Sequence, residues 1–331
     1  MLITRFAPSP TGRLHLGHAW SALQARDFAR AAGGSLLLRI EDIDGTRSRP
    51  EHVSGILEDL EWLGIQWDGP VVFQSERLTL YEAALDRLKA LGVLYPCFCT
   101  RADIAREVAA SLSAPHGPDG PLYPGTCRGL PADPARLAQE PHCWRLDVGK
   151  ALKFLPELAR GGGPSRSDGG GAAVVDGGVP PPPLHHRPLA GGPPPRDKLG
   201  EELTWHDAFA GTVRADPASH GDVVLARKDA PASYHLAVTV DDAAQGVTHV
   251  VRGRDLFAAT HVHRLLQALL DLPTPDYRHH PLLTDAAGNR LAKRHGAPTL
   301  AKLRAQGVDG RALANDLRAG RLPVGFAVAS A

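Results

Sequence analysis

The chain has 331 residues, of which 43% are hydrophobic and 22% charged, and this length suggests about two globular domains of ordinary composition. Its 37 basic and 36 acidic side chains nearly cancel, so no global positive charge indicates a nucleic-acid partner. No apolar run approaches the roughly 18–20 residues of a membrane span, and the first residues lack the basic and apolar regions of a signal peptide. Four cysteines do not suggest a disulfide framework, so we expect a cytoplasmic protein.

Strand and helix patterns alternate along the first 92 residues. They predict a strand over 2–6, a helix over 17–32 and a second strand over 36–40. Two further helices should follow, one that starts at Ser48 and one over 76–91. The fourth element has a capping box, with Ser48 as N-cap, Pro50 in the first turn and Glu51 three residues on. This order predicts an α/β fold with a doubly wound parallel sheet, whose first ligand site is the loop after the first strand.

The composition changes in the middle of the chain. The four cysteines lie between Cys97 and Cys143, and residues 161–200 contain 11 Gly and 9 Pro. Such a segment buries too little apolar surface to offset its ordering entropy, which predicts an irregular linker. Strand-like apolar runs return at 223–225, 236–240 and 247–251. The second half of the sheet should therefore begin near residue 220.

Basic side chains gather at the end of the chain. From Arg278 onward there are nine Lys or Arg residues against three Asp. This arm is either a solvated helical face or a surface that faces RNA, and the charge pattern favours neither.

The sharpest local signal is His15-Leu16-Gly17-His18, where the first loop gives way to a helix. Imidazoles three residues apart on a first helical turn face the same way, and the free backbone N–H groups there favour anions. Gly17 removes a side chain, so that a flat ring such as adenine can lie against the backbone. The arrangement suits ATP phosphates and charge that develops at phosphorus. The alternative is a pair of N-terminal histidines without a ligand.

The segment from Arg5 to His18 resembles the signature of class I glutamyl-tRNA synthetases. Further stretches match in the same order, at 39–44, 234–248 and 251–256. The resemblance covers about residues 1–128 and 220–300. It implies a doubly wound, Rossmann-like class I catalytic core with an inserted zinc-containing subdomain. We expect the first half of the core over residues 1–95 and the insertion over 96–219. The second half of the core, with a mobile lysine loop, is expected over 220–331.

The resemblance also implies how ATP is held. The ATP-binding residues would be His15, Gly17, His18 and Lys293, of which the two histidines and the lysine are catalytic because they stabilise charge. The family's mobile loop carries Lys-Met-Ser-Lys-Ser, whereas the stretch here is Arg-Leu-Ala-Lys-Arg at 290–294, so that only Lys293 is retained. A compact ammonium on a flexible stem suits a phosphate that moves during the reaction. Mg²⁺ is expected with ATP.

Amino-acid recognition follows from charge, because glutamate brings two carboxylates and one ammonium into its pocket. Arg5 and Arg252 can each make bidentate contacts with a carboxylate. Glu41, with help from Ser9, can hold the ammonium, and Tyr234 can donate to the side-chain carboxylate. The resemblance implies an L-glutamate site at Arg5, Phe6, Ala7, Pro8, Ser9, Glu41, Tyr234 and Arg252. By themselves, Arg5 and Glu41 can equally be a structural ion pair.

The cysteines resemble a zinc site. Cys97 and Cys99 lie two residues apart, and Cys127 follows about thirty residues later. Zinc takes four ligands in a tetrahedron, usually thiolates and imidazoles, so either His142 or Cys143 can complete the set. The resemblance instead implies one Zn²⁺ per chain at Cys97, Cys99, Tyr123 and Cys127. Ordinary reduced cysteines are the alternative.

The length selects a branch of the family. Only 37 residues follow Arg294, too few for a helical anticodon-binding domain. The resemblance therefore points to the small members that charge the base queuosine within the anticodon loop of tRNA(Asp). We expect a monomer that binds ATP, L-glutamate and queuosine-containing tRNA(Asp), forms glutamyl-adenylate and transfers glutamate to queuosine. The alternatives are a C-terminally truncated glutamyl-tRNA synthetase that charges tRNA(Glu), a nucleotidyltransferase with the same two-histidine signature, and a zinc-containing RNA-binding module without catalysis.

Overall fold

The computed structural model describes residues 1–110, 116–118, 120–159, 203–227, 230–285, 298–323 and 326–329. The Gly/Pro-rich segment 161–200 and the loop that carries Lys293 lie outside the described residues. Within the described ranges, no helix is both long enough and apolar enough to cross a membrane.

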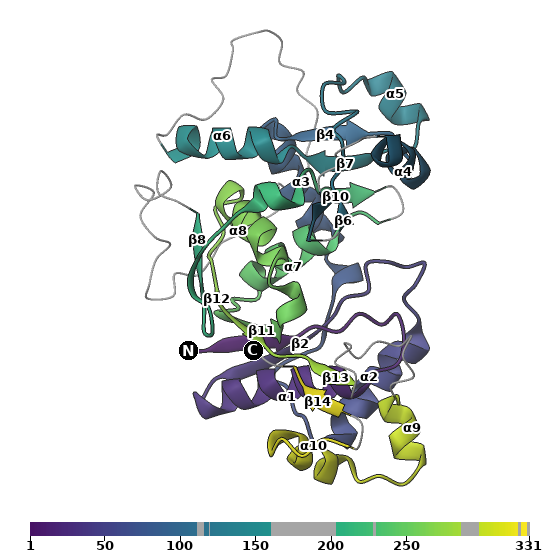
Figure 1. Cartoon of the computed structure of the whole chain (residues 1–331), viewed down its shortest axis with the longest axis vertical. Helices are drawn as coiled ribbons and strands as arrows, with labels where there is room; N and C mark the ends of the chain where they lie inside the picture. Colours follow the sequence, from purple (N-terminus) through teal and green to yellow (C-terminus); the bar gives the residue numbers. More distant parts are fainter. Residues whose placement is uncertain are drawn as a thin grey trace, which may run out of the picture.

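A mostly parallel sheet forms the centre of the molecule (Figure 1). A backbone hydrogen bond of 2.9 Å from Thr248 N to Ile3 O places its two parts side by side. Across the sheet the strands are β3 (Val72–Phe73), β2 (Ser35–Ile40), β1 (Ile3–Phe6), β11 (His249–Gly253), β12 (Asp276–His280), β8 (Thr204–Asp207) and β9 (Gly211–Arg214). Paired neighbours are parallel except β8 and β9. The chain winds outward from β1 to β3 on one side and from β11 to β12 on the other, as in a doubly wound sheet, while β8 and β9, which precede β11 in sequence, form the outer edge beyond β12.

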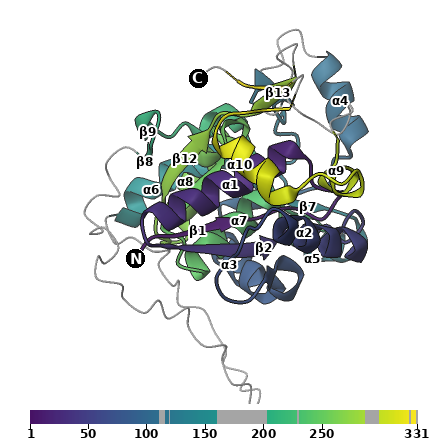
Figure 2. The same cartoon turned by 90° about the horizontal axis from the view of Figure 1, so that it is seen from below.

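Two layers of helices enclose the sheet. One packs its apolar side chains on β1 and β2 and consists of α1 (Leu16–Ala31), α2 (Pro50–Trp62), α9 (Leu300–Ala305) and α10 (Gly310–Arg318). The other forms a second apolar core and consists of α3 (Leu78–Ala90), α6 (Val148–Ala159), α7 (Tyr234–Ala244) and α8 (Ala259–Leu269). Figure 1 separates the two layers, and Figure 2 shows α1 and α10 side by side. The helices expected over 17–32 and 76–91 are confirmed to within two residues at each end.

Two local expectations are wrong. Ser48 does not cap α2: the N-cap is Arg49, because Pro50 occupies the first helical position, and the Ser48 hydroxyl is buried without a hydrogen-bond partner. The apolar run 236–240 is not a strand but the middle of α7, which starts where the Ser233 hydroxyl accepts from Leu236 N. This helix is buried over most of its circumference, and a short apolar run cannot separate a buried helix from a buried strand.

A smaller antiparallel sheet lies beside the core, formed by β4 (Leu94–Cys97), β7 (Cys143–Leu146) and β10 (Val224–Arg227). Four short elements lie between β4 and β7 in the chain: α4 (Arg101–Ala110), β5 (His116–Gly117), β6 (Gly120–Pro121) and α5 (Pro134–Gln139). Elsewhere in the chain, 3₁₀ helices lie at Gln74–Glu76, Pro217–His220 and Arg254–Leu256. Strand pairing crosses the boundary that we expected at residue 219 between the insertion and the second half of the core. The strands β8 and β9 precede this residue but belong to the large sheet, and β10 follows it but belongs to the smaller sheet. An apolar run predicts a buried strand but not its partner.

The basic arm at the end of the chain packs back on the core. In α9, Arg304 forms ion pairs with Asp59 at 2.8 Å and Glu58 at 2.7 Å. In α10, Arg318 forms an ion pair with Asp27 at 2.7 Å. After α9 and α10 the chain returns to the core, where β14 (Phe326–Val328) pairs antiparallel with β13 (Leu283–Asp285), the strand that precedes α9. These ion pairs fasten α9 to α2 and α10 to α1.

The buried carboxylate of Asp222 connects the smaller sheet to its surroundings. Asp222 is 3% exposed. Its oxygens accept hydrogen bonds from Tyr95 Oη at 2.6 Å, Arg128 Nε at 2.8 Å and Val148 N at 3.1 Å. One side chain thus joins β4, the segment after Cys127 and the start of α6.

We expect Asp222→Ala to lower the free energy of unfolding by about 3 kcal/mol, because two buried donors and a half-exposed arginine lose their acceptor. Urea denaturation measures this change. The matched control is Asp86→Ala, which removes an exposed carboxylate paired with Lys89 on α3 and should cost less than about 0.5 kcal/mol. Equal midpoints for the two variants would contradict the role given to Asp222.

Candidate functional site

A cavity of about 430 Å³ opens where β1 and β11 end. Among the residues that line it are Arg5, Phe6, Ala7, Pro8, Ser9, His15, Gly17, His18, Glu41, Tyr234 and Arg252, which are the predicted ATP and glutamate residues except Lys293. The carboxyl ends of parallel strands meet at one edge of a doubly wound sheet, so segments far apart in sequence converge there. The lining also contains Trp20, Asp255 and His280, which the sequence did not single out.

The two histidines cap α1. His15 is the N-cap, and its Nδ1 accepts from Gly17 N at 3.1 Å, while His15 N donates to His18 Nδ1 at 3.1 Å. Their ring centroids lie 3.9 Å apart. A Cβ atom on Gly17 would lie 3.0 Å from His15 Cε1. A methyl group at Gly17 would crowd the His15 ring, which folds over this backbone and would have to shift by a few tenths of an ångström, a constraint that the sequence did not reveal.

Arg5 is held by a carboxylate from the other helical layer. Its Nε and Nη2 donate to the oxygens of Asp242 at 2.9 and 3.3 Å, and Arg39 Nη1 donates to the same carboxylate at 2.8 Å. Burial raises the pKa of Asp242, but Arg5 and Arg39 outweigh it and hold the pKa below its ordinary value. Asp242 is thus an anion in α7 that fixes two arginines of the sheet.

Glu41 does not pair with Arg5. Its side chain is 9% exposed, and its Oε1 lies 3.4 Å from Arg39 Nη2. Burial raises the pKa of Glu41, against the charges of Arg39 and Arg5. The structural ion pair between Arg5 and Glu41 that the sequence left open is therefore absent from this part of the structure: each residue has a different partner.

Arg252 is a buried cation among neutral groups. Its Nη1 donates to Tyr234 Oη at 3.1 Å, and its Nη2 donates to Thr260 Oγ1 at 2.7 Å. Its Nε donates to His279 Nε2 at 3.0 Å. Burial, followed by the charge of Arg252, lowers the pKa of His279 to about 3 and that of His263 well below its ordinary value, so both rings are neutral. Within the described ranges no carboxylate forms an ion pair with Arg252, and such a buried charge favours an anionic ligand.

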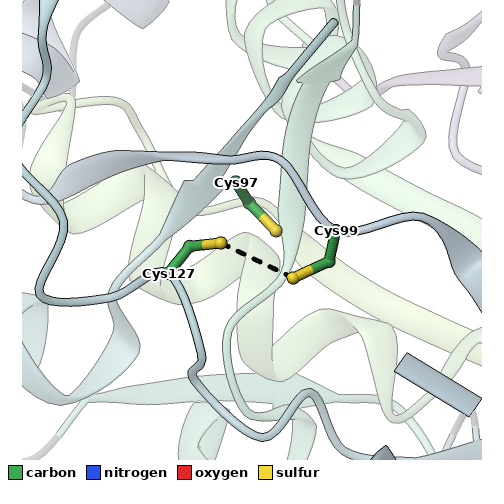
Figure 3. Close-up of side chains that lie close together, drawn as sticks. All are labelled: Cys97, Cys99 and Cys127. Atoms are coloured by element: carbon green, nitrogen blue, oxygen red, sulfur yellow. Dashed lines mark hydrogen bonds between the residues drawn. The ribbon is translucent and has the colours of Figure 1, made fainter. Parts of the chain in front are cut away.

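The cysteines gather at the end of the smaller sheet. The Sγ atoms of Cys97, Cys99 and Cys127 lie within 4.8 Å of one another and point toward a common centre (Figure 3). Tyr123 Oη lies 3.3 Å from Cys97 Sγ and 3.5 Å from Cys99 Sγ, and it accepts from Cys127 N at 2.9 Å. A hydrogen bond from Cys143 lowers the pKa of Cys97 to about 4 in spite of burial.

The alternative fourth ligands lie less favourably. Cys143 is the cross-strand neighbour of Cys97 in β7, outside the compact group of three sulfurs. His142 Nδ1 lies 3.1 Å from the carbonyl oxygen of Glu140. Tyr123 is the residue whose oxygen faces the cysteine sulfurs.

A second cavity of about 1050 Å³ adjoins the first, since Ser9, Glu41 and Tyr234 line both. It extends to Cys97 and Cys99, and its wall carries basic side chains at Arg101, His142, Arg145 and Arg227. The two cavities connect the carboxyl edge of the large sheet with the cysteine cluster.

Comparison with known proteins identifies the family. The class I tRNA synthetase (E and Q) catalytic domain matches residues 1–153 and 196–324. The glutamyl-Q tRNA(Asp) synthetase of Rhodobacter capsulatus is 47% identical over 310 residues, which cover 92% of this chain and 96% of that protein. The protein of the same name from Symbiobacterium thermophilum is 43% identical over 320 residues, which cover 93% of this chain and 82% of the relative.

Among solved structures, a glutamate tRNA ligase from Elizabethkingia meningosepticum, in complex with its amino acid, shares the fold with a TM-score of 0.67 and 24% identity. The match covers 96% of this chain but only 60% of that ligase. The chain belongs to the class I tRNA synthetases of the glutamate and glutamine group and, within it, to the glutamyl-Q tRNA(Asp) synthetases.

Proposed function

We propose that the chain activates L-glutamate with ATP and transfers the glutamyl group to queuosine in tRNA(Asp). The glutamate α-carboxylate attacks the α-phosphate of ATP, which forms glutamyl-adenylate and releases pyrophosphate. A hydroxyl of the queuosine cyclopentene ring then attacks the adenylate carbonyl, which forms an ester and releases AMP. The observation that carries the proposal is the buried Arg252 guanidinium, which lies beside Tyr234 in the cavity with no carboxylate partner among the described residues.

The cavity offers groups for each part of glutamate. Arg252 and Tyr234 suit one carboxylate, and Arg5 Nη1 suits the other. Glu41 supplies a carboxyl group and Ser9 a hydroxyl, and these two side chains suit the ammonium of glutamate. Because Asp242 and Arg39 hold Arg5 and Glu41 in place, their geometry does not have to reorganise when glutamate binds.

The start of α1 is the proposed phosphate site. The positive end of the helix and the paired rings of His15 and His18 suit charge that develops at the phosphates. Mg²⁺ would enter with ATP, since the described residues offer no cluster of three metal ligands other than the cysteines. Lys293 remains a proposed phosphate contact that lies outside the described residues.

The second cavity is the proposed entrance for tRNA. It reaches the glutamate site at Ser9, Glu41 and Tyr234, so a base that enters it can meet an adenylate held in the first cavity. Its basic wall at Arg101, Arg145 and Arg227 suits the phosphates on either side of that base.

The cysteine cluster fits zinc. Four ligands at about 2.3 Å in a tetrahedron place sulfur atoms roughly 3.8 Å apart. The Sγ atoms of Cys99 and Cys127 lie 3.5 Å apart, and Tyr123 Oη lies at a similar distance from two sulfurs. We therefore propose that Cys97, Cys99, Cys127 and Tyr123 hold one zinc ion, which would supply a structural crosslink between β4 and the segment 123–127.

We expect ATP–pyrophosphate exchange with glutamate in the absence of tRNA, because the described cavity contains the activation motifs. Glutamine should be at least about 100-fold worse in kcat/KM, since its neutral amide leaves a buried arginine without a charged partner. Transfer assays should show glutamate on tRNA(Asp) that contains queuosine, but not on tRNA(Asp) that lacks it or on tRNA(Glu). Exchange that requires tRNA, or equal rates with glutamine, would contradict this assignment.

We expect Gly17→Ala to lower the kcat of exchange by up to about 10-fold, because the new methyl group forces the His15 ring to shift by a few tenths of an ångström beside the phosphate site. The control is Gly129→Ala, whose Cβ would have no heavy atom within 4 Å. Exchange kinetics at saturating ATP compare the two variants. If both retain wild-type kcat, the His15 ring does not act at the phosphates.

We expect one zinc ion per chain, which elemental analysis measures after dialysis. The Cys97→Ser/Cys99→Ser variant should lose the metal, and Tyr123→Phe should bind it more weakly, because the ring is kept under Arg145 while the oxygen is removed. Cys143→Ser is the control and should retain zinc. A metal-free wild type, or a double variant with full zinc content, would exclude the site.

A further inference from the structure

A line of three buried polar side chains leads away from the glutamate cavity. Arg252 Nε donates to His279 Nε2 at 3.0 Å, and His279 Nδ1 lies 2.7 Å from Asp207 Oδ2. The residues come from β11, β12 and β8, and Arg252 and His279 are direct neighbours in the β11–β12 register. Neither His279 nor Asp207 lines either of the two cavities. His279 and Asp207 can therefore affect a substrate in the cavity only through their effect on Arg252.

The Asp207 carboxylate is fully used as an acceptor. Its Oδ1 accepts from Phe209 N at 2.9 Å and Ala210 N at 3.0 Å, and its Oδ2 accepts from His279 N at 3.1 Å as well as from the ring. Both oxygens therefore face N–H donors. Asp207 is 1% exposed and His279 is 4% exposed, so water does not compete for these contacts.

This environment fixes the proton on the His279 ring. A carboxylate at Nδ1 requires that nitrogen to carry the hydrogen. Nε2 then presents its lone pair to the N–H of Arg252 Nε, which always carries a hydrogen. The opposite tautomer would set two N–H groups against each other.

The ring is also prevented from turning. Tyr277 stacks on His279 with centroids 5.7 Å apart and an interplanar angle of 4°, and the Trp205 and Phe257 rings lie 5.7 and 5.1 Å away. A rigid acceptor at Arg252 Nε, together with Thr260 at Nη2, leaves Nη1 directed to Tyr234 in the cavity.

We infer that Asp207 is a positioning residue for substrate binding, which orients Arg252 toward the glutamate carboxylate by fixing the tautomer of His279. The inference rests on the proposed function, in which Arg252 binds glutamate. It assigns a role to a residue in β8, outside the motifs that identify the family in this sequence.

The direct test is Asp207→Asn, measured by ATP–pyrophosphate exchange. An asparagine has one acceptor oxygen, whereas the four N–H groups around Asp207 need two. Either the N–H groups of Phe209 and Ala210 lose their acceptor, or an amide NH₂ faces His279 and reverses its tautomer. We expect KM for glutamate to rise about 10- to 100-fold, the range typical of residues that orient a binding group, with KM for ATP within twofold of wild type.

The matched control is Asp59→Asn, which changes another fully buried carboxylate, paired with Arg304 outside both cavities. It should reduce stability without changing KM for glutamate. Equal shifts of the two Michaelis constants in Asp207→Asn, or the same glutamate KM shift in Asp59→Asn, would indicate a merely structural role and overturn the inference. A wild type without glutamate-dependent exchange would instead contradict the proposed function.

A second variant separates the relay from folding. In His279→Gln the amide oxygen can replace Nε2 as acceptor for Arg252 while no ring remains for Asp207 to orient. Asp207→Asn should therefore raise KM for glutamate less in this background than alone, and additive effects would overturn the inference.

The tautomer can be observed in the wild-type protein, which requires no variant of Asp207 to fold. Nitrogen NMR of the histidine rings should show that His279 is neutral and carries its hydrogen on Nδ1. The signals of His279 are assigned as those that are missing from the spectrum of His279→Gln. A hydrogen on Nε2 would overturn the inference.

Discussion

The carboxylate of Asp242 is the contact on which the geometry of the site depends. It lies in α7 and accepts hydrogen bonds from Arg5 of β1 and Arg39 of β2, so that one anion joins a helical layer to the two strands that open the fold. Its neighbour Asp241 accepts from Gln74, Arg77 and Tyr81 and fastens the same helix to α3 and the segment before it. Through this pair of carboxylates, the packing of α7 on the sheet also fixes the position of Arg5 in the cavity.

Buried charges are costly, and apolar side chains would join these layers at less risk. The network is understandable because Arg5 also lines the cavity, while Arg39 is fully buried behind it. Arg5 and Arg39 have an internal counter-ion in Asp242, whereas Arg252 has hydrogen bonds to Tyr234, Thr260 and His279 but no carboxylate within the described part of the chain. The cavity thus has a buried arginine without a carboxylate partner at one wall and the carboxyl group of Glu41 at another.

The smaller sheet depends on different contacts. Asp222 ties β4 to α6, and three cysteines with Tyr123 close the end of the sheet that faces the larger cavity. Because that cavity shares residues with the glutamate site, the zinc proposal and the tRNA proposal concern one continuous surface. A structural metal would stiffen the wall that we propose as the tRNA entrance.

The sequence by itself determined which segments meet at the cavity, because short motifs carry the backbone geometry and side-chain chemistry that the reaction requires. The alternating pattern also predicted α1, β2 and α3, since local periodicity governs helix and strand. Partners distant in sequence were decided only by the tertiary structure. Arg5 and Asp242 are 237 residues apart, and Asp207 and His279 are 72 apart, and no spacing rule relates them. The run 236–240 forms a helix, and β8 pairs with β12 of the large sheet. In both cases burial in the assembled layers, rather than local preference, selects the structure.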